Sequence, residues 1–329
     1  MKSSRRVFWK KVISGALMLG MLMVPGTRAQ AATEVWDTVG SAGSGCTKVA
    51  VSGSYVTEAQ KALDRINAIR LEACKQGVTD PRNTSRKLTV DDYVPLKWSA
   101  DMEYIARVRA AEASLVVSHT RPNGEKFYTV TSNGVAPNGE VLAWNAKKTM
   151  LSGIEQWYSE KSDWVKKTGN VTGHYEAMIN PANKSVGLSC FVNKNGCYLS
   201  TISGEFSTKA STKTTMSDAA SDIDVIIEIK KTALDSTVSL VRTYSTNSST
   251  TYKVGDKMDF AIGMKSTLEG WSATVFDPGK LTWKSSDTSV ATVTSEGRVT
   301  VVGIGSSTIS ATSTTGRSAS IKVTALGTQ

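Results

Sequence analysis

The sequence predicts an α+β protein built from two parts. Apolar residues recur at helical spacing from Thr57 onward, and two β-like runs around Asn195-Gly196 follow these helices. This order of elements favours an α+β unit over a repeated β-α-β fold. After residue 221, alternating runs separated by glycines predict an all-β sandwich. The length of 329 residues suits two domains, since a domain averages about 150 residues.

The first 31 residues have the three parts of an export signal: a basic start, an apolar run from Val12 to Val24, and a small-residue exit at Ala29-Gln30-Ala31. We expect cleavage after Ala31. The alternative, an uncleaved membrane anchor, requires about 20 apolar residues, and this run is shorter. Because no later stretch is apolar enough to span a bilayer, we expect a secreted, extracellular protein whose mature form has no transmembrane segment.

The charge of the chain argues against a nucleic-acid partner. The chain has 39 basic and 29 acidic residues, but six of the basic residues lie within 1–31, which has no acidic residue. The mature chain therefore keeps 33 basic and 29 acidic side chains, too small an excess to indicate phosphate binding. Glu112 and Glu155 are interpreted as surface charge on predicted helices.

Four cysteines in an exported chain predict two disulfides, because export leads to an oxidising compartment. Cys190 and Cys197 flank Asn195-Gly196, a strong turn signal, so we expect the two strands to bring these sulfurs together. This leaves Cys46 to pair with Cys74. A cysteine metal site is disfavoured, since the sequence has no Cys-x-x-Cys pair.

Three helices are predicted in the first part. The first runs from Thr57, which forms a capping box with the glutamine three residues later, to about Lys75. The second follows Ser99, an N-cap residue, and continues to about Leu115. The third spans about residues 148–164.

The predicted organisation has a boundary where the composition changes. Eight of the fifteen residues in 207–221 are Ser or Thr, which is typical of a linker. The segments are the export signal (1–31), an N-terminal extension (32–54), the first domain (55–206), the linker (207–221) and the second domain (222–329). The predicted strands are Ser185–Phe191 and Tyr198–Phe206 in the first domain, and Thr282-Trp283, 290–293, 298–302, 307–311 and 318–323 in the second.

Seven short motifs of the first domain occur in the order typical of one family. They are Ala-Leu-Asp-Arg-Ile-Asn-Ala-Ile-Arg, Leu-x-Trp at residues 96–98 with the helix after it, His-Thr-Arg-Pro-Asn-Gly, Gly-Glu-Val-Leu-Ala, Trp-Tyr-Ser-Glu-Lys, Gly-His-Tyr and Gly-Glu-Phe at residues 204–206. Over residues 55–206 the chain closely resembles the CAP superfamily, also called SCP/TAPS or the cysteine-rich secretory, antigen 5 and pathogenesis-related 1 domain, in its bacterial secreted form. The resemblance implies an α-β-α sandwich.

The same resemblance implies a site. Two histidines and two acidic residues face one large cleft in the family, and this tetrad falls on His119, Glu140, Glu160 and His174. Two neutral imidazoles and one carboxylate match a His₂Glu zinc site with an open position, so zinc or another divalent cation is the expected cofactor. The alternative is a hydrogen-bonded polar cluster that only organises the cleft. The chain departs from many animal members at Asn180, which stands in the place of a tryptophan.

The second domain resembles the bacterial Ig-like group 2 module. The resemblance rests on Lys-Val-Gly-Asp at 253–256, Trp-Lys-Ser-Ser-Asp at 283–287, Val-Ala-Thr-Val at 290–293, Gly-Arg-Val at 297–299 and the run at 303–311. Such modules serve as spacers or adhesive units on secreted and surface proteins. None of these residues is chemically reactive, so we expect a folded stalk in which Trp283 belongs to the core.

Three functions from different classes fit these observations. The favoured one is a secreted protein whose cleft binds a divalent cation or a small lipid-like or glycan ligand, while the Ig-like module positions it at the cell envelope, the cell wall or a host surface. The second is a metal-assisted secreted hydrolase acting on peptides, with Glu140 or Glu160 as base. The third is a non-catalytic adhesin that binds a surface protein. The sequence has neither Gly-x-Ser-x-Gly nor His-Glu-x-x-His, so it does not favour an enzyme.

Overall fold

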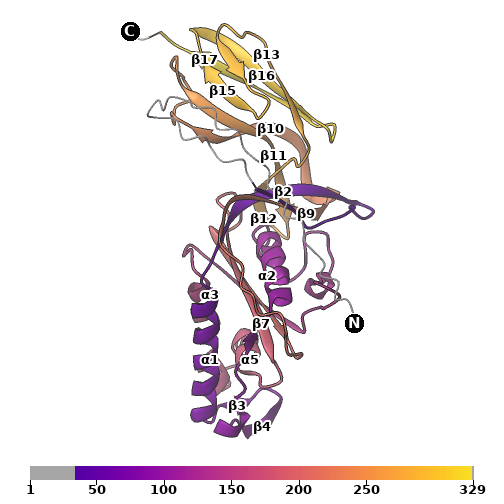
Figure 1. Ribbon diagram of the computed structural model, residues 1–329, viewed down its shortest axis with the longest axis vertical. Helices are drawn as coiled ribbons and strands as arrows, with labels where there is room; N and C mark the ends of the chain where they lie inside the picture. Colours follow the sequence, from indigo (N-terminus) through magenta and orange to yellow (C-terminus); the bar gives the residue numbers. More distant parts are fainter. Residues whose placement is uncertain (1–33, 328–329) are drawn as a thin grey trace, which may run out of the picture. The chain divides into compact units, whose positions relative to one another are not determined.

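The computed structural model describes residues 34–327, so the predicted export signal lies outside the described residues. The α-helices all lie in the first part of the described chain, before residue 180 (Figure 1). They are α1 (Ala59–Lys75), α2 (Ala100–Ala113), α3 (Met150–Ser159), α4 (Lys161–Lys166) and α5 (Gly173–Ile179), with short 3-10 turns at Val90–Asp92, Phe127–Thr129 and Lys231–Ala233. Over the residues described, no helix has the length and apolar character needed to cross a membrane.

Strands occur in both parts of the chain. Those of the first part are β1 (Glu34–Asp37), β2 (Cys46–Val56), β3 (Thr79–Asp80), β4 (Asn83–Lys87), β5 (Lys97–Trp98), β6 (Gly139–Asn145), β7 (Ser185–Val192) and β8 (Ser200–Ser207). Those that follow are β9 (Ala220–Lys230), β10 (Leu234–Ser245), β11 (Lys257–Leu268), β12 (Trp271–Phe276), β13 (Leu281–Ser285), β14 (Ala291–Val293), β15 (Arg298–Val301), β16 (Gly305–Ser313) and β17 (Ser318–Ala325).

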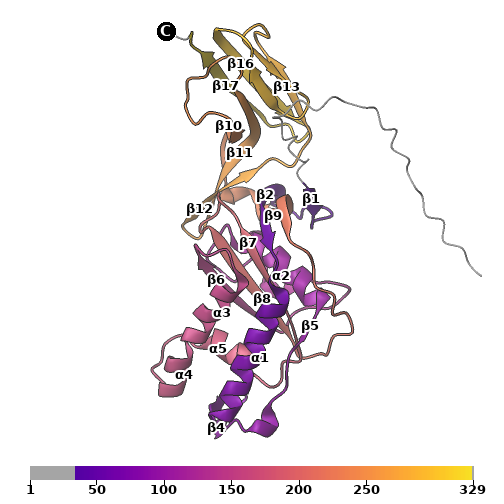
Figure 2. The same ribbon diagram turned by 60° about the vertical axis from the view of Figure 1, so that its left-hand side comes forward.

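The first part is an α-β-α sandwich around the antiparallel strands β7, β8 and β6. Helices α1, α3 and α5 cover one face of these strands and share an apolar core with them, whereas α2 packs against the other face (Figures 1 and 2). Residues on β7 and β8 alternate between the two faces, so each strand contributes to both layers. The predicted α+β class is therefore confirmed.

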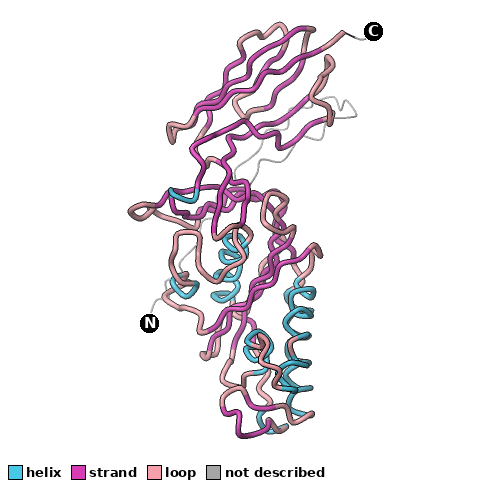
Figure 3. Tube along the Cα trace, turned by 180° about the vertical axis from the view of Figure 1, so that it is seen from behind, coloured by secondary structure: helices cyan, strands magenta, loops and turns pink. Residues whose placement is uncertain are grey.

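The second part is an all-β, Ig-like sandwich. Strands β13, β16 and β17 form one sheet, and β10, β11, β14 and β15 belong to the other. The two sheets enclose an apolar core that includes Phe260, Ile262, Val299 and Ile309, and the partly buried Trp283 packs against it. The strands predicted from the alternating pattern are all present, within one or two residues of the expected ends. Figure 3 shows the strands in magenta.

The segments on either side of the first predicted domain form regular structure together. Strand β2, from the predicted N-terminal extension, pairs antiparallel with β9 along most of its length. The predicted linker also contacts the first domain, since the Ser217 amide donates to the Glu103 carboxylate at 3.0 Å and the Ala100 amide donates to the Lys213 carbonyl at 2.9 Å. The boundaries at 206–207 and 221–222 stay a prediction.

The helix predictions hold in their main features. Ser99 caps α2, because its hydroxyl accepts from the Met102 amide at 3.3 Å. The capping box at Thr57 is wrong: Glu58 is the N-cap of α1, and it makes no capping hydrogen bond through its side chain. The third predicted helix is divided into α3 and α4 at Glu160.

Both predicted disulfides are wrong for this structure, in which all four cysteines are free. The β7–β8 hairpin ladder stops at Val192, so Asn195-Gly196 lies inside a longer loop and not in a two-residue turn. Cys190 faces the core under α1, whereas the Cys197 amide donates to the Ser114 carbonyl at the end of α2, on the other face. The other predicted pair is also separated, since Cys46 begins β2 beside Lys230 and Cys74 lies in the last turn of α1.

Helix α2 approaches β7 so closely that only glycine fits at residue 187. A Cβ added to Gly187 would lie 1.9 Å from the Glu103 backbone nitrogen and 2.3 Å from the Met102 carbonyl carbon. Both contacts are with backbone, so neither neighbour can rotate away. This close approach lets α2 bury polar side chains against the sheet.

We predict that Gly187→Ala lowers the free energy of unfolding by about 3 kcal/mol or more, because α2 must move away from β7. Urea denaturation of the two proteins measures the difference. Gly139→Ala, in β6 of the same sheet, is the matched control, since a Cβ there meets nothing within 4 Å. Equal effects of the two substitutions would show that α2 is not held at this distance.

Candidate functional site

His119 and Glu140 form the first of two histidine–carboxylate pairs. His119 lies in the loop that follows α2, and Glu140 is the second residue of β6. The His119 Nδ1 atom lies 2.7 Å from Glu140 Oε1. The carboxylate is fully buried, whereas the imidazole is 50% exposed. The ring is therefore fixed from inside the protein and presents its Nε2 edge away from the carboxylate.

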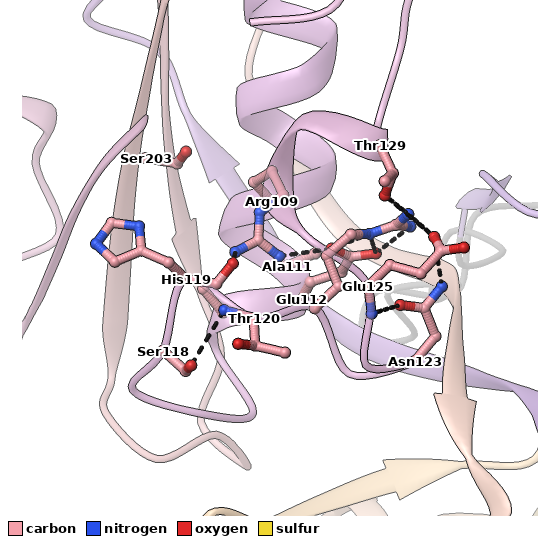
Figure 4. Close-up of polar contacts among 12 residues, drawn as sticks. Arg109, Ala111, Glu112, Ser118, His119, Thr120, Asn123, Glu125, Thr129 and Ser203 are labelled. Carbon is pink, nitrogen blue, oxygen red and sulfur yellow. Dashed lines mark hydrogen bonds and ion pairs between the residues drawn. The ribbon is translucent and has the colours of Figure 1, made fainter. Parts of the chain in front are cut away.

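A buried arginine holds this carboxylate in place. Arg109 Nε donates to Glu140 Oε2 at 2.6 Å, and Arg109 Nη1 donates to Glu112 Oε2 at 2.7 Å. Arg109 Nη2 also donates to the His119 carbonyl at 3.4 Å (Figure 4). Arg121 donates to the other oxygen of Glu112 at 2.8 Å. One guanidinium thus joins α2, β6 and the loop that carries the histidine.

His174 and Glu160 form the second pair by a different route. Glu160 lies between α3 and α4, and His174 is in the first turn of α5. The His174 Nδ1 atom lies 2.5 Å from Glu160 Oε1, and Glu160 Oε2 accepts from the backbone amides of His174 and Tyr175 at 3.0 and 3.1 Å. The carboxylate therefore anchors both the start of α5 and the ring on it.

The two pairs face each other through their rings. The centroids of His119 and His174 are 6.3 Å apart, with 25° between the ring planes. The Phe127 ring meets the edge of His119, with 6.4 Å between centroids, and Tyr128 beside it is exposed. The structure thus brings all four residues of the predicted tetrad together, with the imidazoles in the middle and the carboxylates behind them.

The charges around Glu140 favour its ionised form. Burial alone would raise the pKa of Glu140, but the hydrogen bond from His119 and the charge of Arg109 outweigh it and hold the pKa below its usual range. Burial opposes the charge of Arg109 too, yet Glu140 and Glu112 raise the pKa of the guanidinium. Arg109 and Glu140 therefore form an ion pair, and the Glu140 carboxylate accepts from His119 Nδ1.

Sequence reasoning missed the residues that support the first pair. The prediction that Glu112 is surface charge is wrong, because this side chain is buried and bound by two arginines. The spacing of Arg109 and Glu112, three residues apart on a helix, is the signal that could have identified this pair. Glu155 does lie at the surface, where it pairs with Arg65.

The carboxylates do not join the imidazoles as a group of metal ligands in this arrangement. Within residues 34–327, no cluster of three or more His, Cys, Asp or Glu side chains is placed to hold a metal ion. Glu140 and Glu160 lie on the Nδ1 side of the rings, where they act as hydrogen-bond acceptors. Metal binding and the large cleft stay predictions.

Two regions of the chain match models of known families. Residues 63–208 match the cysteine-rich secretory protein family, CAP. Residues 277–315 match the intimin immunoglobulin-like domain. The CAP region contains all four residues of the two pairs. The second match supports an Ig-like domain, while its assignment to the group 2 module stays a prediction. A comparison with curated proteins gave no match.

Solved structures of intimin show limited similarity to the chain. An intimin mutant from EHEC O157:H7 is 23% identical over 28% of this chain and 44% of that chain, with a TM-score of 0.18. The intimin–Tir90 complex is 24% identical over 28% of this chain and 44% of that chain, with a TM-score of 0.17. A C-terminal 282-residue intimin fragment, in complex with the intimin-binding domain of the translocated intimin receptor, is 20% identical over 42% of this chain and 47% of that chain, with a TM-score of 0.18. The chain thus spans less than half of each of these intimin chains.

We predict that Arg109→Met lowers the free energy of unfolding by about 3–5 kcal/mol, because it leaves Glu140 and Glu112 buried without their shared cation. The difference in the free energy of unfolding between wild type and Arg109→Met should shrink as the pH falls below 4.5, the ordinary pKa of a glutamate. The reason is that a carboxylate with a lowered pKa contributes stability above that value and loses it as acid protonates the folded state.

Chemical denaturation at several pH values measures this loss. Arg65→Met is the control, because it breaks the Arg65–Glu155 pair, whose side chains are 31% and 50% exposed, and exposed pairs contribute at most about 1 kcal/mol. Similar losses for the two variants, or a difference that does not change with pH, would contradict the role given to Arg109.

Proposed function

We propose that the protein is a secreted binding protein whose paired histidines, His119 and His174, hold a divalent cation or a small ligand. The Ig-like region then positions this site at the cell envelope or at a host surface. The proposal deepens the expectation from the sequence in one respect: the two imidazoles, and not the carboxylates, contact the bound species.

The observation that carries the proposal is that both Nδ1 atoms are bonded to carboxylates. A carboxylate that accepts from Nδ1–H fixes the tautomer in which Nε2 has a free lone pair. The same arrangement lies behind most metal-binding histidines and raises their basicity. Two histidines built in this way at one place supply two directed nitrogen donors.

The spacing of the rings is close to that needed for one bound cation. With a Zn–N distance of about 2.0–2.1 Å, the centroids of two rings on one zinc ion lie at most about 6 Å apart. The observed separation is 6.3 Å, with 25° between the ring planes, so the rings would have to close and turn for both Nε2 atoms to reach one cation. Such a cation would have two protein ligands and water in its other positions, and would supply a Lewis acid at that point. Binding through only two protein ligands should be weak.

The hydrolase alternative has less support. It requires Glu140 or Glu160 as a base toward bound water, yet Glu140 is fully buried and already bonded to Arg109 and His119. Glu160 is bonded to a ring and to two backbone amides. Neither carboxylate is therefore directed at the space between the rings.

The match of residues 277–315 to the intimin Ig-like domain supports a role in display or contact for the second part. A surface protein is the partner class that we propose for the Ig-like region, in addition to the small ligand of the histidine pair.

We predict that the mature protein binds zinc weakly at neutral pH and binds magnesium less well, since imidazole suits zinc and magnesium favours oxygen ligands. His119→Ala and His174→Ala should each abolish measurable uptake. Glu140→Gln and Glu160→Gln should weaken it by about 10- to 100-fold, the usual effect of removing a partner behind a ligand. Acid should release the metal, because a protonated imidazole cannot ligate.

Isothermal titration calorimetry measures these affinities. Glu155→Gln is the matched control, because it removes an exposed carboxylate outside the two pairs, and it should leave zinc binding unchanged. An absence of zinc uptake by the wild type, or the same uptake in the variant that combines His119→Ala with His174→Ala, would contradict the cation proposal.

A further inference from the structure

A third glutamate lies behind the first pair, and no role has been given to it. Glu205 lies on β8, directly across the ladder from Glu140 on β6. Its side chain is fully buried. The Ser203 hydroxyl donates to Glu205 Oε1 at 2.9 Å, and Ser203 lies on the side of Arg109 where the His119 ring is found (Figure 4). Glu205 Oε2 has no donor among the described residues.

The charges of this buried group balance only if Glu205 is neutral. Arg109 and Arg121 match the buried carboxylates of Glu112 and Glu140, and Arg121 also pairs with Glu125, which is exposed at the edge of the group. A third carboxylate would add an uncompensated negative charge in a place without water, which is costly. Glu205 and Glu140 are also direct partners across the β6–β8 ladder, so their side chains lie on the same face of the sheet, and two buried carboxylates so placed cannot both be ionised at low cost.

We infer that Glu205 is a neutral carboxylic acid that donates a hydrogen bond from Oε2 to the Glu140 carboxylate, and that it thereby positions His119. This proton gives the unpartnered oxygen a partner and completes the set of donors around Glu140: Arg109, Glu205 and His119. In agreement, burial and then the charge of Glu140 raise the pKa of Glu205 well above its usual range.

Glu205 is thus a positioning residue for one histidine only. Glu160 obtains its donors from the backbone amides of His174 and Tyr175, and no hydrogen bond joins Glu160 to Glu205 in the described part of the chain. The two pairs therefore differ in how the carboxylate is held, and His174 serves as an internal control. The inference concerns the site of the proposed function, but its test requires no bound cation.

The experiment compares wild type, Glu205→Gln and Glu205→Leu by ¹⁵N NMR of the histidine rings, without added metal. The glutamine amide keeps a donor for Glu140, so Glu205→Gln should leave the His119 ring nitrogens in the wild-type tautomer. Leucine removes the donor, so the His119 signals should shift while those of His174 stay unchanged. Unchanged His119 signals in Glu205→Leu, or equal shifts in both variants, would overturn the positioning role.

A second measurement applies even if Glu205→Leu does not fold. Infrared spectra at neutral pH should show the carbonyl band of a protonated carboxylic acid in wild type, and this band should be lost in Glu205→Gln. The absence of such a band in wild type would overturn the neutral state of Glu205.

The pH dependence of stability gives an independent check on that state. When folding raises the pKa of an acid, the protein loses stability, relative to a variant with a neutral residue there, as the pH rises above the ordinary pKa of 4.5. The denaturation midpoint of Glu205→Gln should therefore rise relative to wild type between that pH and neutrality. A constant difference between the two proteins would contradict a protonated Glu205. Because none of these readouts uses zinc, a failure of zinc binding would leave this inference standing.

Discussion

The buried guanidinium of Arg109 is the interaction on which the candidate site depends. It joins Glu112 on its own helix, Glu140 on β6 and the carbonyl of His119 in the loop after α2. Burying charges costs several kcal/mol per ion unless each has a partner. Here the partners come from three segments, so the network can form only when the helix, the strand and the loop are all in place. The position of His119 is thereby coupled to the packing of α2 on the sheet.

The two histidines are fixed by different means, although the ring contacts look alike. His119 depends on side-chain charges buried beneath α2, whereas His174 depends on a carboxylate that caps the start of a short helix. Substitutions beneath α2 should therefore affect one ring and spare the other. In both cases the protein uses its acidic groups to orient imidazoles through Nδ1, which leaves the Nε2 atoms free of the carboxylates.

Much of the fold, but less of the site, could be predicted from the sequence. Amphipathic spacing was sufficient for α1, because local periodicity records burial on one face. The Ser99 cap indicated the start of α2, although this helix is buried on most of its sides. Helix α5, with seven residues, is too short to show a period and is anchored by Glu160, which is distant in sequence. The disulfide assignment failed because the Asn-Gly signal does not determine the length of the hairpin loop. Burial of Glu112 and Glu205 depends on how α2 and β8 meet, which a single sequence does not record.

A crystal structure of the mature protein soaked with zinc, with anomalous diffraction at the zinc edge, tests the central claim most directly. The account predicts one zinc ion between the Nε2 atoms of His119 and His174, with Glu140 and Glu160 still bonded to the Nδ1 atoms. A zinc ion held by either carboxylate, or rings turned so that Nδ1 faces the metal, would contradict it.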